Sequence, residues 1–292
     1  MSIALFSGDS SYGGISFIAN HIPNSTVFLT SSIRKDFDNM INNKIYIKEK
    51  NKFFGELEKK DEIIIFSAYS LIKFLKNVGV EQLNHFKRKT IILSDTTYKT
   101  QSKKWNGFMV KNNFKILSMP DLCRFLGDIE HKPYWQHINI DNKLIERKND
   151  VITITHSPTS RKRNSDSKGT KKIKTALNDY NLEIISGDNW NICVRKKSKS
   201  HIFIDQMNGG GLGKSGLEGM LLGCLTITSG NLAKTEPYFP TAPVVICNID
   251  NLKETIDYYI NNPEEYNKKV KEQKEWADKY LSAEFVVKNI LE

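Results

Sequence analysis

The stretch HIFIDQMNGGGLGKSGLEGMLLG, residues 201–223, decides the fold. It starts with an apolar, strand-forming run that ends at Asp205, and it continues through a glycine cluster at 209–213. From about Ser215 to Leu222 its apolar residues recur with the period of an amphipathic helix. Four glycines in five positions cost folding entropy, so they indicate a backbone that must approach another group closely. A strand, a glycine loop and a helix in this order predict one βα unit of a parallel sheet.

Around this stretch, the second half of the chain alternates short apolar runs with helical patterns. A polar and charged segment at 141–150 precedes it and is the expected linker. The expected strands are 151–155, 182–186, 201–205, 225–228 and 244–247, and the expected helices are 171–180, 215–222, 252–261, 263–279 and 283–291.

The first half of the chain shows the same alternation. Strands are expected at 2–6, 24–29, 44–47, 62–66, 89–93 and 115–117, with helices starting at 15–20 and covering 71–78. The apolar character of 62–66 is typical of a strand buried on both faces of a parallel sheet. We therefore predict an α/β protein with two Rossmann-like domains, 1–147 and 148–280, that face each other across a cleft. Ligands of such sheets bind at the carboxyl ends of the strands.

The composition fits two ordinary domains and excludes other classes. Of the 292 residues, 39% are hydrophobic and 26% are charged, which excludes a disordered or collagen-like chain. The apolar runs are too short to span a bilayer, and the first residues lack the pattern of a signal peptide. The four cysteines lie far apart without metal-ligand spacing, so we expect reduced thiols in a cytoplasmic protein.

The charge balance is strongly basic. Lysine and arginine number 43 against 33 acidic residues, which gives a net charge of +10. Such an excess favours an anionic partner, which could be nucleic acid, an acidic membrane surface or a phosphorylated substrate. It does not decide among them, and a Lys-, Asn- and Ile-rich composition from AT-rich coding DNA explains the charge equally well.

Two loops have residues that could hold a phosphate. Residues 7–14 follow the first strand and precede a helix, so their glycine amides and the helix N-terminus suit an anion. They lack the spacing of a dinucleotide or Walker motif, and an ordinary strand-to-helix turn explains them as well. The second loop starts at His156, and residues 161–174 carry seven basic side chains and one acid. These cations could clamp a diphosphate, although most charge runs are solvated.

Two further features of the second half have a functional and a plain interpretation. Glu218 lies one turn into the helix after the glycine cluster, where its carboxylate could accept hydrogen bonds from the hydroxyls of a ribose. A helix carboxylate stabilised by the macrodipole is the plain alternative. The basic run at 195–199 is interpreted as solvated.

The segment from Lys87 to Lys115 combines charge with aromatic residues. It carries eight basic side chains and one acid, Asp95, interleaved with Tyr98, Trp105, Phe108 and Phe114. This combination suits a nucleic acid whose phosphates are bound and whose bases are stacked or extruded, but core aromatics beside solvated lysines fit equally well. Asp95 directly follows an apolar strand, where catalytic groups of α/β proteins lie. No D-x-D sequence or His/Cys/Glu cluster is present, so no tightly held metal is expected.

In this order, the motifs resemble those of GT-B glycosyltransferases, especially the large retaining group known as family 4. Residues 151–292 resemble its nucleotide-sugar domain throughout. The resemblance rests on His156-Ser157-Pro158-x-x-Arg161 with Lys168-Gly169-Thr170, on Gly211-Leu212-Gly213 through Glu218-Gly219-Met220-x-x-Gly223, and on the paired Gly13-Gly14. It implies the GT-B fold, with residues 281–292 as a C-terminal helix that returns to the first domain.

The resemblance also implies an activity: transfer from a nucleoside diphosphate sugar, above all a UDP-sugar, with retention and without a tightly bound metal or cofactor. Arg161 and Lys168 would stabilise the leaving diphosphate. Asp95 would orient the acceptor, or act as the base if the enzyme inverts, with Asp9 as second choice. The implied donor contacts are Gly13, Gly14, His156, Ser157, Gly209, Gly210, Gly211, Leu212, Gly213 and, for the ribose, Glu218.

One position departs from the family pattern. Family 4 usually has two glutamates separated by seven residues, and Glu218 matches the second of them. The first falls on Gly210. Since the family's first glutamate contacts the donor sugar, recognition of the sugar must differ in this chain.

The acceptor is the most open point. The first domain matches the family little and would hold the acceptor. Small basic GT-B enzymes also resemble the DNA-modifying glucosyl- and arabinosyltransferases of T-even-like phages. That resemblance implies 5-hydroxymethylcytosine in DNA as the acceptor and an infected bacterial cytoplasm as the location. Lys99, Lys103, Lys104 and Trp105 of the basic, aromatic segment are then the expected DNA-binding residues, and a monomer is favoured although the oligomeric state is open. The alternatives are a cytoplasmic or membrane-peripheral enzyme of lipopolysaccharide or other surface-glycan synthesis, and a non-catalytic DNA-binding protein on the same fold.

Overall fold

The chain forms two compact units. The first comprises Met1–Ile138 together with Leu281–Glu292, and the second comprises Asn139–Tyr280. The computed structural model describes residues 2–7, 15, 18–30, 41–94, 105–123, 126–140, 151–158, 166–208, 211–230, 232, 235 and 238–292. Below, the unit of Met1–Ile138 with Leu281–Glu292 is called unit 1, and the unit of Asn139–Tyr280 is called unit 2.

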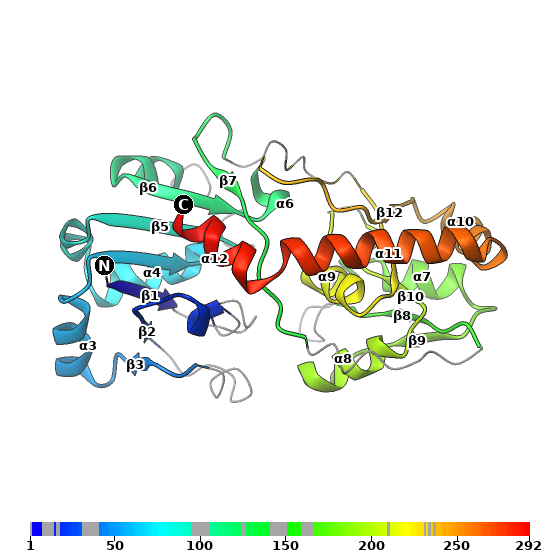
Figure 1. The fold of residues 1–292 in the computed structure, drawn as a ribbon, viewed down its shortest axis with the longest axis horizontal. Helices are drawn as coiled ribbons and strands as arrows, with labels where there is room; N and C mark the ends of the chain where they lie inside the picture. The colour runs from blue at the N-terminus through cyan, green and yellow to red at the C-terminus, as the bar shows by residue number, and fades with distance from the viewer. Residues whose placement is uncertain are drawn as a thin grey trace. The chain divides into compact units, whose positions relative to one another are not determined.

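Unit 1 is built on a seven-stranded parallel sheet with the order β3-β2-β1-β4-β5-β6-β7 (Figure 1). Its first six strands therefore have the 3-2-1-4-5-6 order of the doubly wound fold, whose switch point lies between β1 and β4. The strands are β1 (Ile3–Ser7), β2 (Ser25–Leu29), β3 (Lys44–Tyr46), β4 (Glu62–Phe66), β5 (Arg88–Leu93), β6 (Phe114–Ser118) and β7 (Lys132–Pro133).

Apolar residues cover both faces of this sheet. Ile63 and Ile65 of β4 belong to one buried cluster, and Ile64 and Phe66 belong to another, because successive side chains of a strand point to opposite faces. The prediction of a strand buried on both faces is confirmed here.

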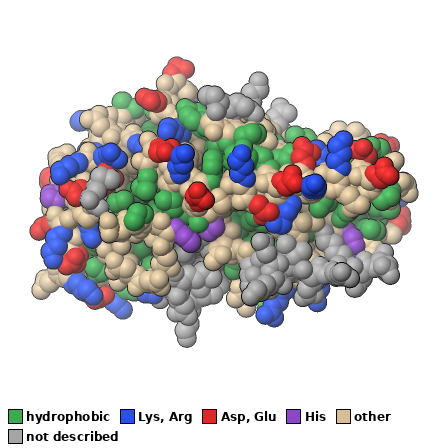
Figure 2. All heavy atoms as spheres, viewed as in Figure 1, with side chains coloured by type: hydrophobic (Ala, Val, Ile, Leu, Met, Phe, Trp, Pro, Cys, Tyr) green, Lys and Arg blue, Asp and Glu red, His purple; other side chains and the backbone are tan. Residues whose placement is uncertain are grey.

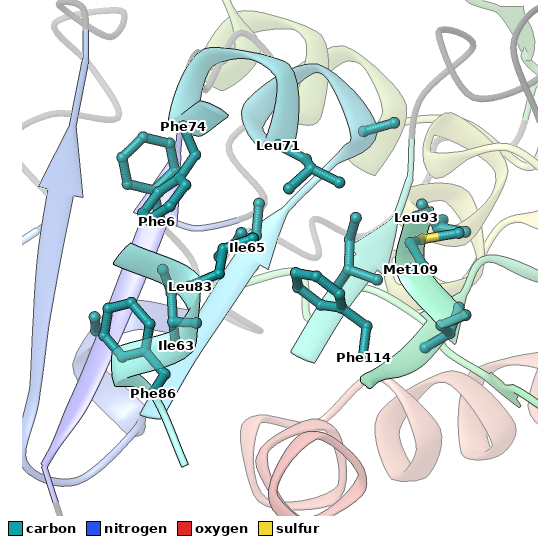
Figure 3. Close-up of a cluster of buried hydrophobic side chains, with 14 of the residues drawn as sticks. Phe6, Ile63, Ile65, Leu71, Phe74, Leu83, Phe86, Leu93, Met109 and Phe114 are labelled. Carbon is teal, nitrogen blue, oxygen red and sulfur yellow. The ribbon is translucent and has the colours of Figure 1, made fainter. Parts of the chain in front are cut away.

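Helices complete both clusters of unit 1. On the first face, α4 (Ala68–Asn77) packs its Phe74 ring against Phe6, and Figure 3 shows the two side chains together. The rings meet edge-on with 4.9 Å between their centroids. On the second face, α12 (Ala283–Leu291) buries Val286 and Ile290. Other helical segments in the described part of unit 1 include η1 (Ala19–His21), α3 (Lys50–Leu57), η2 (Glu81–His85), residues 105–111 and α6 (Pro120–Cys123).

Unit 2 is a smaller parallel sheet with the order β12-β11-β10-β8-β9. Counted along the chain this is the order 2-1-3-4-5 of the flavodoxin-like fold, whose switch point lies between β8 and β10. Its strands are β8 (Ile154–His156), β9 (Leu182–Ile184), β10 (Ile202–Ile204), β11 (Leu225–Thr228) and β12 (Val245–Ile246). Its helices are α7 (Thr170–Ala176), α8 (Trp190–Ser198), α9 (Lys214–Leu221), α10 (Leu252–Asn261) and α11 (Pro263–Tyr280).

Helix α9 lies unusually close to the sheet of unit 2, because two of its residues are glycines. A Cβ at Gly219 would meet Thr226 Oγ1 at 2.9 Å and the Phe203 side chain at 3.0 Å. A Cβ at Gly216 would meet the Leu212 side chain at 2.5 Å. Glycine therefore lets the helix backbone approach β10 and β11, and this fixes the position of the helix N-terminus.

The outer face of α11 is solvated. Lys269, Lys271 and Lys274 pair with acidic residues one turn along the helix. Figure 2 shows basic and acidic side chains interspersed over this region. These lysines are thus neutralised locally. Among the described residues, no helix is long and apolar enough to cross a membrane.

The predicted fold class is confirmed: the chain is an α/β protein with two parallel sheets. The three C-terminal helices also lie where they were expected. Helices α3 and α8 and the short strand β7 were not predicted. The expected linker at 141–150 lies outside the described residues.

Candidate functional site

The carboxyl edge of the unit 2 sheet collects polar groups at its switch point. His156 ends β8 and pairs in register with Ile204, the last residue of β10. Asp205 follows directly, and the two loops after these strands meet where the Met207 amide donates to the Lys168 carbonyl at 2.9 Å. The crevice outside such a switch point is where open α/β sheets bind ligands.

A buried ion pair joins these loops. The Asp205 side chain is fully buried, and its Oδ1 accepts a hydrogen bond from the Lys168 ammonium at 2.8 Å. Its Oδ2 accepts the backbone N–H of Gly213 at 2.5 Å. One carboxylate therefore holds both the predicted phosphate-binding lysine and the predicted glycine loop. The Lys168 side chain is 18% exposed, so a ligand can reach it.

Glycine is required at two positions of this edge. Gly169 has φ +77, and a Cβ there would lie 3.2–3.3 Å from the Asn208 and Met207 side chains. Gly211 has φ +78, and its carbonyl accepts hydrogen bonds from Gln206 Nε2 at 2.6 Å and Thr228 Oγ1 at 2.8 Å. The glycine loop is thus tied to the ends of β10 and β11.

The N-terminus of α9 begins at this loop. Gly213 is its N-cap and provides no side-chain cap. The first amides of a helix carry partial positive charge and suit an anion. Together with the Lys168 ammonium, this arrangement can bind phosphate groups without a metal ion.

His156 is buried beneath the site and is uncharged. Its Nδ1 lies 2.9 Å from the Ile204 carbonyl, and its Nε2 lies 2.9 Å from Thr170 Oγ1. A carbonyl can only accept, so Nδ1 carries the proton and Nε2 accepts from the threonine hydroxyl. Burial lowers the pKa of His156 to about 4, against the smaller opposing effect of the bond to Ile204. Its role in the structure is to join β10 to the start of α7.

Glu218 has partners that the sequence did not indicate. Its Oε1 accepts from the Trp190 indole at 2.8 Å, and its Oε2 accepts from Lys197 at 2.5 Å. The Glu218 and Lys197 side chains are 5% and 1% exposed. Lys197 also donates to Ser215 Oγ at 2.9 Å. The carboxylate therefore anchors α9 to α8 inside unit 2.

Charge explains how this carboxylate stays ionised. Burial would raise the pKa of Glu218, but the positive charges of Lys197 and Lys214 and the hydrogen bonds from Lys197 and Trp190 lower it overall. The interpretation of 195–199 as a solvated run is wrong for Lys197, which is a core residue.

The structure brings together part of the predicted site. Lys168, His156, Gly211, Gly213 and Glu218 surround one edge of unit 2. Ser157 follows β8, and Leu212 is buried in the glycine loop. Other predicted residues lie outside the described part of the chain, namely Asp9, Gly13, Gly14, Asp95, Lys99, Lys103, Lys104, Arg161, Gly209 and Gly210.

Trp105 does not lie where a stacking residue would. It is only 6% exposed, and its ring meets Phe108 edge-on within the core of unit 1. Phe114, another aromatic of the same segment, is 8% exposed in that core. The packing explanation of these aromatics is therefore favoured over base stacking.

Two functional positions were missed by the sequence reasoning. Asp205 directly follows an apolar strand, which is the same signal that drew attention to Asp95. Lys197 carried no usable signal, because a buried lysine within a basic run looks like its solvated neighbours.

Comparison with known proteins supports the fold. No protein-family model matches the chain, and no curated protein sequence matches it. Among solved structures, HepE of Anabaena in complex with UDP has a TM-score of 0.72 at 11% identity, covering 100% of this chain and 98% of that one. HepE was also solved with UDP-glucose.

Two other solved structures show the same likeness. A glycosyltransferase from Rickettsia africae has a TM-score of 0.66 at 13% identity, covering 99% of this chain and 97% of that one. WaaG, a glycosyltransferase of lipopolysaccharide biosynthesis, has a TM-score of 0.59 at 11% identity, and 99% of each chain is covered. The chain has the GT-B fold.

The His156 environment predicts a pH-dependent stability. The folded pKa of about 4 lies below the unfolded value near 6.5, so between these values only the unfolded state gains a proton. Stability is therefore present above pH 6.5 and is lost as pH falls towards 4, by about 3 kcal/mol for this group. His137, whose pKa burial also lowers, adds to the slope. In urea unfolding between these pH values, His156→Asn should reduce the pH dependence of the unfolding free energy. An unchanged pH dependence in this variant contradicts the assignment.

The buried pair of Lys197 and Glu218 predicts a marked asymmetry between single and double substitutions. Lys197→Met leaves a buried carboxylate unpaired and should cost about 3–5 kcal/mol of unfolding free energy. Lys197→Met with Glu218→Leu removes both charges and should recover most of that loss. Urea unfolding of the two variants measures this, with Lys199→Met, an exposed neighbour, as the control. Equal losses in both variants would show that the pair does not act as a unit.

Proposed function

We propose that the protein is a glycosyltransferase that transfers a sugar from a nucleoside diphosphate sugar bound at the carboxyl edge of unit 2. The observation that carries this proposal is the Asp205 carboxylate, which holds the Lys168 ammonium and the N-terminus of α9 at the switch point of the sheet. Structures of the same fold were solved with UDP and UDP-glucose, which supports a uridine nucleotide as the carrier.

In this proposal the chain's own groups stabilise the leaving diphosphate. The Lys168 ammonium has three N–H donors, of which one points to Asp205, so others are left for phosphate oxygens. Asp205 orients the ammonium before the substrate arrives. Negative charge on the diphosphate grows as the glycosidic bond breaks, so preorganised donors stabilise the transition state more than the ground state. Arg161 is proposed as a second cation, and the reaction needs no bound metal.

Retention of configuration is proposed from the resemblance to family 4. Asp95 then orients the acceptor rather than acting as a strong base. Glu218 is proposed to contact the ribose, although its side chain is only 5% exposed and both of its carboxylate oxygens already accept hydrogen bonds. The alternative is that Glu218 acts only as the anchor of α9. Calorimetry of wild type and of Lys197→Met with Glu218→Leu, with UDP and with 2′,3′-dideoxy-UDP, separates the two. Only a ribose contact makes the loss of affinity smaller for the nucleotide that lacks the ribose hydroxyls.

For the acceptor we propose a saccharide of a lipopolysaccharide or another surface glycan. The burial of Trp105 and Phe114 weakens the stacking half of the argument for DNA. Of the basic residues in the segment 87–115, Lys99, Lys103 and Lys104 still fit an anionic acceptor, and many bacterial surface glycans carry phosphate or carboxylate groups. A hydroxymethylated base in DNA is the competing acceptor, and a non-catalytic DNA-binding protein is the competing class.

The diphosphate role of Lys168 predicts a loss of turnover that is larger than the loss of donor affinity. Lys168→Met alone leaves the buried Asp205 unpaired, so the test variant is Lys168→Met with Asp205→Asn. Its rate of UDP release from UDP-glucose should fall about 100-fold or more, the usual effect of removing one such donor. Affinity for UDP by calorimetry should fall less. Lys174→Met, an exposed lysine of α7, is the control. Wild-type turnover in the test variant would remove Lys168 from the mechanism.

The acceptor is identified by intact-mass analysis. The protein is incubated with a panel of nucleotide sugars and either truncated lipopolysaccharide or hydroxymethylated duplex DNA. We expect a mass increase of one sugar on the lipopolysaccharide and none on the DNA. Modification of the DNA alone overturns the saccharide proposal but not the glycosyltransferase proposal. Donor binding without transfer to either, with salt-dependent DNA affinity, favours the non-catalytic class.

A further inference from the structure

A cavity of about 470 Å³ lies at the amino edge of the unit 1 sheet. Glu62 and Arg88 begin β4 and β5, and Asn113 directly precedes β6, so three neighbouring strands start at its wall. The last turn of α12, with Ile290 and Leu291, closes another side, and Figure 1 shows α12 next to these strands. The predicted functional loops of unit 1 follow the opposite, carboxyl ends of the strands.

Basic side chains outnumber the acidic ones in the cavity wall, where Glu62 and Glu292 are the acidic residues. Lys87, Arg88, Lys89 and Lys115 all line it, together with the hydrogen-bonding side chains of Thr90 and Asn113. Two of these positive charges are already paired with carboxylates. Lys87 pairs with Asp61 at 2.8 Å, and Arg88 lies 3.2 Å from Glu62. Among the described residues, no ion pair joins Lys89 to a carboxylate.

The surroundings of Lys115 show the sign of the electrostatic potential in the cavity. The Lys115 ammonium donates to the Ile290 carbonyl at 2.8 Å, at the C-terminal end of α12. The pKa of Lys115 is lowered to about 8, mainly by burial. Repulsion by Lys132 and Arg88 also lowers this pKa, and their effect is larger than the opposing attraction of Glu292 and Glu62. Lys115 therefore experiences a local excess of positive charge. An added anion would relieve this imbalance.

We propose that this cavity binds the phosphate group of a small, soluble phosphorylated molecule. Its volume lies within the roughly 300–1,000 Å³ of typical small-molecule sites and exceeds what a bare ion needs. Lys89 and Lys115 contact the phosphate, with Thr90 and Asn113 as hydrogen-bond partners. Ile64, Ile290 and Leu291 supply an apolar wall for the remainder of the ligand. This site is separate from the donor site of unit 2 and does not depend on the proposed function.

The position of the cavity gives binding a structural effect. One wall belongs to the sheet and another to α12, so a ligand bridges the two. Because it binds only the folded arrangement, it stabilises unit 1 by RT ln(1 + c/Kd), where c is its concentration, so the stability rises with the logarithm of that concentration above Kd. It also favours the charged form of Lys115 and so strengthens the bond from this lysine to the Ile290 carbonyl.

The test is calorimetry and thermal unfolding with inorganic phosphate and glucose 6-phosphate, in the full chain saturated with UDP to block the donor site. We expect saturable binding of both compounds, with a lower Kd for glucose 6-phosphate than for inorganic phosphate. The melting temperature should rise with the ligand concentration. Lys89→Gln should weaken binding about tenfold, as loss of one charge-assisted contact does. Lys76→Gln, an exposed lysine of α4, should not change it. NMR titration of the reductively methylated lysines should show a higher pKa for Lys115 with phosphate.

Lys115→Met would also remove the hydrogen bond to α12, so a loss of binding in that variant could come from a structural change. Lys89→Gln is therefore the variant that tests the phosphate site. Equal binding by wild type and Lys89→Gln overturns the proposal. So does a lack of saturable binding in the millimolar range. Binding of phosphatidic acid vesicles, lost in Lys89→Gln, without binding of the soluble phosphates would mean a membrane surface instead and likewise overturns it.

Discussion

The candidate donor site depends on one buried carboxylate. Asp205 has no solvent exposure, so its charge is tolerable only because Lys168 and the Gly213 amide satisfy it. Those two partners come from loops after different strands. The desolvation of Asp205 thus forces both loops into one arrangement, and the lysine and the helix N-terminus face the same space before any ligand binds. This is the preorganisation that a diphosphate site needs, because donors that are already oriented cost little to use.

A second buried ion pair holds the same helix from the other side. Lys197 and Glu218 connect α8 to α9, while Gly216 and Gly219 let α9 lie directly on the sheet. The N-terminus of α9 is therefore fixed by a charge pair, by close packing and by the Asp205 bond. Buried ion pairs contribute little net stability compared with apolar residues of similar shape, but they tolerate no misplacement of either partner. They determine where α9 lies more than how stable the unit is.

The sequence predicted the fold well, because hydrophobic periodicity and glycine loops are local signals. The strand at 62–66 and the helices at 252–261 and 263–279 needed nothing beyond their own residues. Helix α8 was missed because its outer face reads as a basic run, and Lys197 could be placed only once its partner across the unit was known. The same limit applied to Trp105, since an aromatic among lysines has the same local pattern whether it faces water or a core.

The charge of the chain illustrates why composition identifies partners poorly. A net charge of +10 suggests a large anion, yet many lysines of the described residues are engaged locally. On α11 they pair with carboxylates one turn away, and at the donor edge Lys168 is held by Asp205. What attracts an anion is a place where cations outnumber carboxylates within a few ångströms and are partly shielded from water. By that criterion the amino edge of unit 1, where a half-buried lysine is repelled by its neighbours, matters more than the sum over the whole chain.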